Sequence, residues 1–131
     1  MIVIDASAVL ELVLRTEKGK KVEARALVPE EGLHAPHLID VEVTQALRRL
    51  VQLKEITAVR AKQALGDHAA LHIKRADHED MLERLWDLRE SITAYDGTYV
   101  VLAEVLDAPM ITCDSKLARS HGHRAIIELI E

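Results

Sequence analysis

Four acidic residues stand where they can act together on a bound metal ion: Asp5, Glu42, Asp96 and Asp114. Asp5 directly follows the apolar run Ile2-Val3-Ile4, and Asp114 follows the run Met110-Ile111-Thr112. In open α/β sheets ligands bind beyond the carboxyl ends of the strands, and both acids fall there if these runs are strands. Each acid also suits the cap of a following helix, so position alone leaves simple capping open as an alternative.

Glu42 borders the apolar stripe of a helix expected over residues 38–53, with Leu38 and Ala46 among its neighbours along that helix. This position predicts a half-buried carboxylate. The alternative is a surface ion pair between Glu42 and Arg49 on the same helix.

Asp96 lies on an apolar helix face, because the residues three, four and seven positions further on are Tyr99, Val100 and Ala103. An acid on such a face needs a partner, since burying an isolated charge is costly. Residues 93–96 also match a capping-box pattern. Capping and metal binding are compatible, so both interpretations of Asp96 stay open.

Together the four acids favour a site for a hard divalent cation such as Mg²⁺ or Mn²⁺, which prefers oxygen ligands and bridges to phosphates. Ser7 and Thr112 are candidates to orient the acids or a bound water, with local backbone capping as the alternative. Spaced Cys and His pairs of the zinc type are absent, and we interpret His121 and His123 as part of a polar turn.

The elements that must position these residues alternate between strand and helix. Strands are expected over residues 2–5, 33–35, 72–75, 110–112 and 125–127. Helices are expected over residues 6–14, 18–27, 38–53, 57–71, 80–89, 94–106 and 114–119, with N-caps at Thr57, Thr93 and Asp114 and with Gly122 ending the last helix. The alternation predicts an α/β domain with a largely parallel sheet.

The composition predicts one domain over residues 1–131, because 49% hydrophobic residues suffice for a single sizeable core. No apolar stretch reaches the roughly 18 residues that a membrane span requires. No signal peptide is recognisable, and the lone Cys113 cannot form an internal disulfide. We therefore expect a cytoplasmic protein without a membrane segment.

The formal charge of −5 argues against a simple electrostatic nucleic-acid binder. Bound divalent ions would weaken this objection, because they add positive charge at the place where a phosphate must sit. The chain has no Phe, one Trp and two Tyr. If the substrate is a nucleic acid, backbone and shape should therefore matter more than aromatic stacking.

The chain resembles the PIN-domain family, and within it the VapC-type toxins of bacterial toxin–antitoxin pairs. Four strings in family-like order and spacing carry the resemblance over nearly the whole chain: Val3–Leu10 with its Asp-x-Ser pattern, Glu42 followed by Ala46-Leu47, Thr93–Tyr99 continuing to Leu102-Ala103, and Thr112–Ala118. Gly97 departs from the pattern, because relatives often carry Ala there. Glycine inside a helix costs about 0.5–1 kcal/mol, but no acid is lost.

The resemblance implies a parallel five-stranded sheet flanked by helices, a homodimer, and a Mg²⁺- or Mn²⁺-dependent endoribonuclease. Asp5, Asp96 and Asp114 would bind one or two metal ions, and Glu42 would help to hold a metal or its water. A VapB-type antitoxin encoded nearby is the implied partner. Candidates for binding RNA phosphates are Arg15, Arg48, Arg49, Lys116 and Arg119. For each of them the alternative is a solvent-exposed position on a helix without a role in binding.

Other function classes fit the residues less well. Aspartyl phosphatases need a second Asp where this chain has Ser7, and a response-regulator receiver needs paired acids after the first strand and a late strand-end Lys. A non-catalytic interaction module, whose acidic pocket receives an Arg of a partner, remains an alternative. So does a housekeeping RNA-processing nuclease.

Overall fold

A computed structural model describes residues 1–131, and five short strands form its central sheet. The strands are β1 (Ile2–Ile4), β2 (Leu33–Pro36), β3 (Ile73–Ala76), β4 (Met110–Thr112) and β5 (Ile127–Leu129). They follow the order β3-β2-β1-β4-β5, and every neighbouring pair is parallel. β1 and β4 are fully buried, as expected for short apolar strands covered on both faces. The parallel five-stranded sheet expected from the sequence is thereby confirmed.

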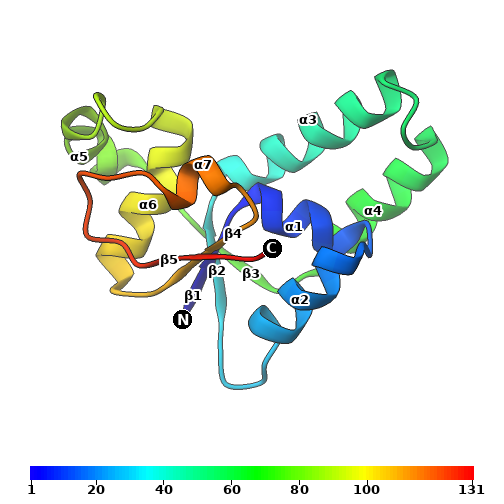
Figure 1. Cartoon of the computed structure of the whole chain (residues 1–131), viewed down its shortest axis with the longest axis horizontal. Coiled ribbons are helices and arrows are strands. Elements are labelled where there is room, and N and C mark those ends of the chain that lie inside the picture. Colours follow the sequence, from blue (N-terminus) through cyan, green and yellow to red (C-terminus); the bar gives the residue numbers. More distant parts are fainter.

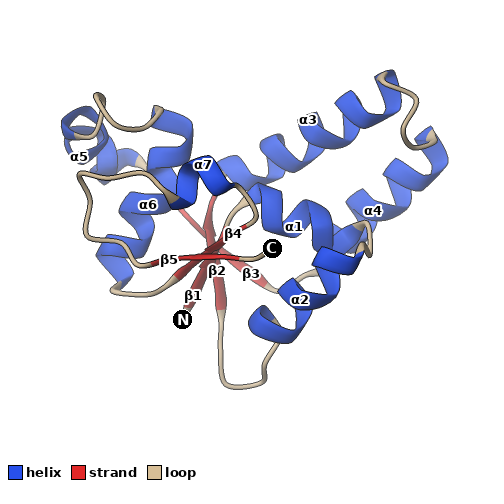
Figure 2. Cartoon of the chain, viewed as in Figure 1, coloured by secondary structure: helices blue, strands red, loops and turns tan.

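Helices connect the strands and cover the sheet. They are α1 (Ala6–Val13), α2 (Glu17–Ala26), α3 (Leu38–Gln52), α4 (Ala58–Ala70), α5 (Leu82–Asp87), α6 (Ala94–Leu106) and α7 (Ser115–Ala118), with a 3₁₀ turn at Glu79–Met81. In Figure 2 α5 and α6 lie on one side of the sheet, and α1 and α2 lie on the other. The starts of α1, α3 and α7 meet at one edge of the sheet, opposite the N-terminus (Figure 1). None of the helices combines the length and the apolar character needed to cross a bilayer.

The helix α6 is central to the core, because all seven residues from Gly97 to Ala103 are buried. A Cβ atom at Gly97 would lie 2.8 Å from Cδ2 of Leu85, so the missing side chain lets α5 pack closely against α6. The glycine that departs from the family pattern therefore has a packing role here, which offsets part of its cost in helix stability.

The three helix N-caps expected from the sequence, Thr57, Thr93 and Asp114, form as side-chain hydrogen bonds. Asp5, for which capping was left open as an alternative, also caps α1. The largest errors lie near the C-terminus. The last strand was expected over residues 125–127 but pairs as Ile127–Leu129, because Met110, Ile111 and Thr112 of β4 take Ile127, Glu128 and Leu129 as partners.

The last helix was also expected to be longer. It ends at Ala118 instead of Arg119, and Gly122 lies in the following loop with a φ of +87°. The expected helix over residues 80–89 is likewise divided into the 3₁₀ turn and the short α5.

Candidate active site

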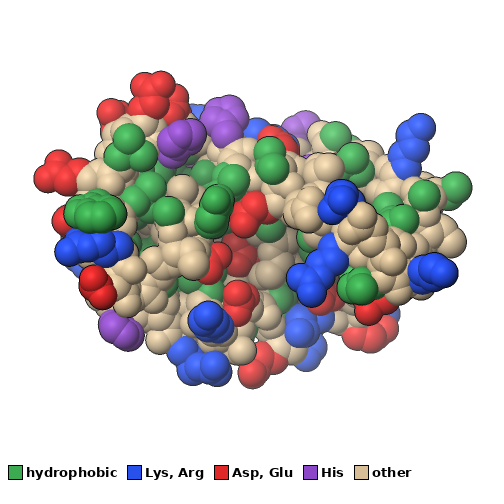
Figure 3. All heavy atoms as spheres, turned by 90° about the horizontal axis from the view of Figure 1, so that it is seen from above, with side chains coloured by type: hydrophobic (Ala, Val, Ile, Leu, Met, Phe, Trp, Pro, Cys, Tyr) green, Lys and Arg blue, Asp and Glu red, His purple; other side chains and the backbone are tan.

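Asp5 and Asp114 follow the adjacent strands β1 and β4, at the point where the strand order of the sheet reverses. β1 and β4 are neighbours, but the connection from β1 leads to β2 on one side, and that from β4 leads to β5 on the other. Such a switch point opens a crevice at the carboxyl edge of a parallel sheet. Figure 3 looks onto this edge from above, and acidic side chains are visible in a hollow near its centre.

The Asp5 carboxylate is held by hydrogen bonds from both sides of this crevice. Its Oδ1 accepts from Ser7 Oγ at 2.7 Å and from the Ala8 amide at 2.9 Å, and its Oδ2 accepts from Thr112 Oγ1 at 2.5 Å. Ser7 Oγ in turn accepts from the Cys113 amide, and Thr112 Oγ1 accepts from the Asp114 amide. Ser7 and Thr112 thus join β1 to β4 and orient Asp5, while Asp5 also caps α1.

Glu42 lies in the early part of α3 and is half buried, as its position beside the apolar stripe predicts. The alternative pairing with Arg49 does not form. Instead, Glu42 Oε1 accepts a hydrogen bond from the Tyr99 hydroxyl at 2.6 Å. Burial and the hydrogen bond to Glu42 raise the pKa of Tyr99, so this hydroxyl stays protonated and donates. Sequence reasoning assigned Tyr99 only to the core, although a buried Tyr hydroxyl requires a polar partner.

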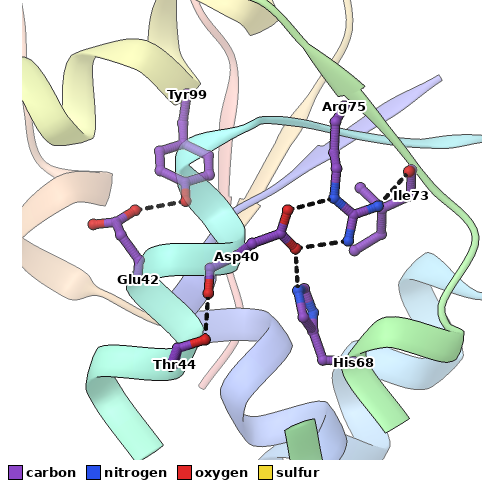
Figure 4. A network of polar contacts seen from close by, with 7 residues as sticks. All are labelled: Asp40, Glu42, Thr44, His68, Ile73, Arg75 and Tyr99. Atoms are coloured by element: carbon purple, nitrogen blue, oxygen red, sulfur yellow. Dashed lines mark hydrogen bonds and ion pairs between the residues drawn. The ribbon is translucent and has the colours of Figure 1, made fainter. Parts of the chain in front are cut away.

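A second polar network fixes the beginning of α3 and with it Glu42 (Figure 4). Asp40 accepts two hydrogen bonds from the Arg75 guanidinium, both at 2.7 Å, and Asp40 Oδ1 lies 2.7 Å from Nε2 of the buried His68. The bonds from Arg75 hold the pKa of Asp40 at about 2, so the pair is ionised at neutral pH. The network ties α3 to β3 and α4.

Asp96 is the carboxylate through which the four acids are electrostatically coupled. Burial raises the pKa of Asp5 to about 6 and also raises that of Glu42, and the charge of Asp96 adds to both shifts. The pKa of Asp96 itself is raised by burial and by the charge of Asp114, and is lowered by Lys116 and Thr93. The four side chains therefore share one electrostatic environment, which separate helix caps would not require.

The remaining lone pairs of these acids suit a hydrated divalent cation. Asp5 Oδ2 accepts only one of the two hydrogen bonds it can take, and the amides that Asp114 caps bind only its Oδ1. No three His, Cys, Asp or Glu side chains stand close enough together to form a complete ligand set. Mg²⁺ keeps several waters and often binds through one or two carboxylates, so the residues present fit such an ion.

The basic residues considered for RNA binding fall into separate places. Lys116 and Arg119 line a cavity that also contains Asp96. Arg15 lies at the far end of α1 from Asp5 and pairs with Asp67 at 3.7 Å. Arg48 lines a groove between α3 and α4 with no acid of the site. Arg49 is exposed further along α3 than Glu42. Lys116 and Arg119 are therefore the two candidate RNA-binding residues that the fold places beside an acid of the site, Asp96.

The parallel α/β sheet and the carboxylates at its β1/β4 switch point define the class of protein. The PIN-domain family model matches residues 2–121, and the chain belongs to that family. It is 42% identical over 130 residues to Ribonuclease VapC12 of Mycobacterium tuberculosis, covering 99% of both chains. It is 40% identical to Ribonuclease VapC1 of the same species, covering 98% of this chain and 96% of the relative. VapC ribonuclease Mb0985 of Mycobacterium bovis is 39% identical, with 90% of this chain and 89% of the relative covered.

The fold also matches a solved structure. The crystal structure of PAE2754 from Pyrobaculum aerophilum superposes with a TM-score of 0.68 and covers 96% of this chain and 87% of that chain. The two sequences are 24% identical, so the likeness bears on the fold alone.

Proposed function

We propose that this protein is a Mg²⁺- or Mn²⁺-dependent endoribonuclease of the VapC type, the toxin of a toxin–antitoxin pair. The observation that carries the proposal is the arrangement at the sheet's switch point, where the Thr112 hydroxyl joins Asp5 to the Asp114 amide. The charge of Asp96 acts on Asp5 and Glu42 at the same place, and that of Asp114 acts on Asp96. The relatives named as VapC ribonucleases support it from sequence, because they cover nearly the whole chain.

Each acid has a role in hydrolysis of the phosphodiester bond. Asp5, Asp96 and Asp114 would hold the metal directly or through its bound waters, and the metal when bound lowers the pKa of water and neutralises phosphate charge. Glu42, oriented by Tyr99, accepts a proton from the attacking water. The water oxygen bonds to phosphorus as the ester bond opposite breaks, and the leaving ribose oxygen takes up a proton from solvent.

Metal removal tests this proposal most directly. The purified, antitoxin-free protein is expected to cleave RNA with Mg²⁺ or Mn²⁺, to lose the activity in EDTA and to regain it when the metal is restored. Without the metal, no cation among the four acids lowers the pKa of the water or neutralises the charge of the phosphate. Gel assays of labelled RNA measure this. Undiminished cleavage in EDTA would refute the mechanism, and an Asp96→Asn preparation purified in parallel controls for contaminating nucleases.

Tyr99→Phe should lower the cleavage rate by about 10–100-fold, because Glu42 loses the hydroxyl that orients it toward the attacking water. Only the hydroxyl that binds Glu42 is removed, so the unfolding free energy should fall by only about 1 kcal/mol. Initial rates and denaturant titrations measure the two effects.

Thr44→Ala is the matched control for Tyr99→Phe, because it removes a hydroxyl two residues from Glu42 that donates only to the Asp40 carbonyl. It should retain the wild-type rate. Equal rates for both variants and the wild type would show that Glu42 does not depend on Tyr99.

The proposal includes a VapB-type antitoxin that inserts a basic side chain among the four acids, since an Arg guanidinium suits carboxylates. It also includes a homodimer, which light scattering of the purified protein tests. A non-catalytic interaction module would bind such a partner without cleaving RNA. A housekeeping RNA-processing nuclease would cleave RNA but have no antitoxin gene beside its own.

A further inference from the structure

A polar groove next to the acidic site is lined by residues of α7 and of the loop that joins α5 to α6. Figure 1 shows where these two segments lie in the fold. The groove has a volume of about 480 Å³, and Asp96 lies on its wall. The other charged or titratable groups that line it are Arg89, Glu90, Lys116, Arg119 and His121. The groove therefore shares a residue with the proposed catalytic site, and its cations flank that residue.

The cations of this groove are available to a ligand. Lys116 and Arg119 form no ion pair, whereas most other arginines of the chain do. Arg89 approaches Glu90 at 3.8 Å, but both side chains are exposed, and such pairs are weak. Arg89 also lies over the Trp86 ring, 4.7 Å from its centre, which holds the guanidinium in place.

The backbone adds positive potential at the same place. Thr93, which also lines the groove, caps α6 because its Oγ1 accepts a hydrogen bond from the Asp96 amide. The amides of Ala94 and Tyr95 have no acceptor in the protein. The N-terminus of a 13-residue helix carries a partial positive charge, which supports the three cationic side chains in attracting an anion. The local charge is thus opposite in sign to the −5 of the whole chain.

We propose that this groove binds the sugar–phosphate backbone of RNA next to the phosphate that is cleaved. The inference rests on the proposed ribonuclease function and adds the path of the substrate. The groove contains three cations but no Phe, Tyr or Trp side chain, which favours contacts to phosphates over stacking with bases. Lys116 and Arg119 are the principal contacts, and Arg89 continues the path away from Asp96.

The test compares two double variants that lose the same charge. Lys116→Ala with Arg119→Ala removes groove cations, and Lys54→Ala with Lys62→Ala removes two exposed, unpaired cations of the α3–α4 hairpin. Binding of a fluorescent single-stranded RNA is measured by anisotropy in EDTA, where neither cleavage nor bound metal contributes. The groove variant should bind the RNA about tenfold more weakly than the wild type. The slope of its log Kd against the logarithm of the salt concentration should be smaller by roughly 1.4, because two phosphate contacts are lost.

Cleavage with Mg²⁺ completes the test. The groove variant should show a raised KM with little change in kcat. The single variant Arg119→Lys should keep most of the wild-type affinity, because it keeps the positive charge. If the wild type cleaves RNA and the groove variant equals the hairpin variant in affinity, salt slope and KM, the groove is not the path of the substrate. If the wild type does not cleave RNA with Mg²⁺, the proposed function itself fails.

Discussion

Asp96→Asn is expected to abolish RNA cleavage and yet to leave the metal-free protein as stable as the wild type, or more stable, at neutral pH. The charge of Asp96 acts unfavourably on Asp5 and Glu42, and Asp114 acts unfavourably on Asp96. Removing the central charge relieves all three repulsions. Loss of a metal ligand should lower the rate by more than the roughly 10–100-fold typical of groups one shell further out.

Melting temperatures of the wild type and Asp96→Asn, each with and without Mg²⁺, measure the stability effect. A ligand that binds only the native state stabilises it more the tighter it binds. Mg²⁺ should therefore raise the melting temperature of the wild type more than that of the variant. A mere helix-capping role predicts the opposite set of results: an active variant, destabilised by about 0.3–1 kcal/mol and equally responsive to Mg²⁺.

The second large effect is a loss of stability of the metal-free protein as the pH rises. Burial raises the pKa of Asp5 from 3.8 to about 6, so the folded state holds this proton more tightly than the unfolded state does. The resulting stabilisation is fully present below about pH 4 and is lost as the pH rises through 6. At neutral pH the loss should be about 3 kcal/mol. The lowered pKa of Asp40, about 2, acts only in more acidic solution.

Denaturant unfolding in EDTA measures this loss when it is repeated at several pH values from about 4 to about 7. This range spans the pKa of Asp5 in the unfolded and in the folded state. Asp5→Asn is the control, because it removes this titrating group and should make the profile shallower, leaving the contribution of the raised pKa values of Glu42 and Asp96. Added Mg²⁺ should act in the opposite direction and stabilise the wild type increasingly as the pH rises, since the metal requires deprotonated ligands. Identical profiles for Asp5→Asn and the wild type would exclude a raised pKa for Asp5.

Local chemistry in the sequence was sufficient to predict most of the elements. The N-caps at Asp5, Thr57, Thr93 and Asp114 depend on a side chain and an amide two or three residues away, so they can be recognised without knowing the fold. β5 was misplaced by two residues because its position depends on a long-range contact with β4. An alternating apolar pattern is nearly unchanged by a two-residue shift, which leaves the same faces in place.

The sequence by itself determined the order of strands and helices and supplied four acids, three of them at strand ends or helix starts. The tertiary structure alone decided that Asp96 is electrostatically coupled to the other three, that Tyr99 orients Glu42, and that Lys116 and Arg119 lie in the groove at Asp96 whereas Arg15 does not. The physical reason is that capping and helix periodicity act between near neighbours in the chain. Coupling between charges and the shape of a groove arise from distances in space, and residues such as Glu42 and Tyr99 are 57 positions apart in the sequence.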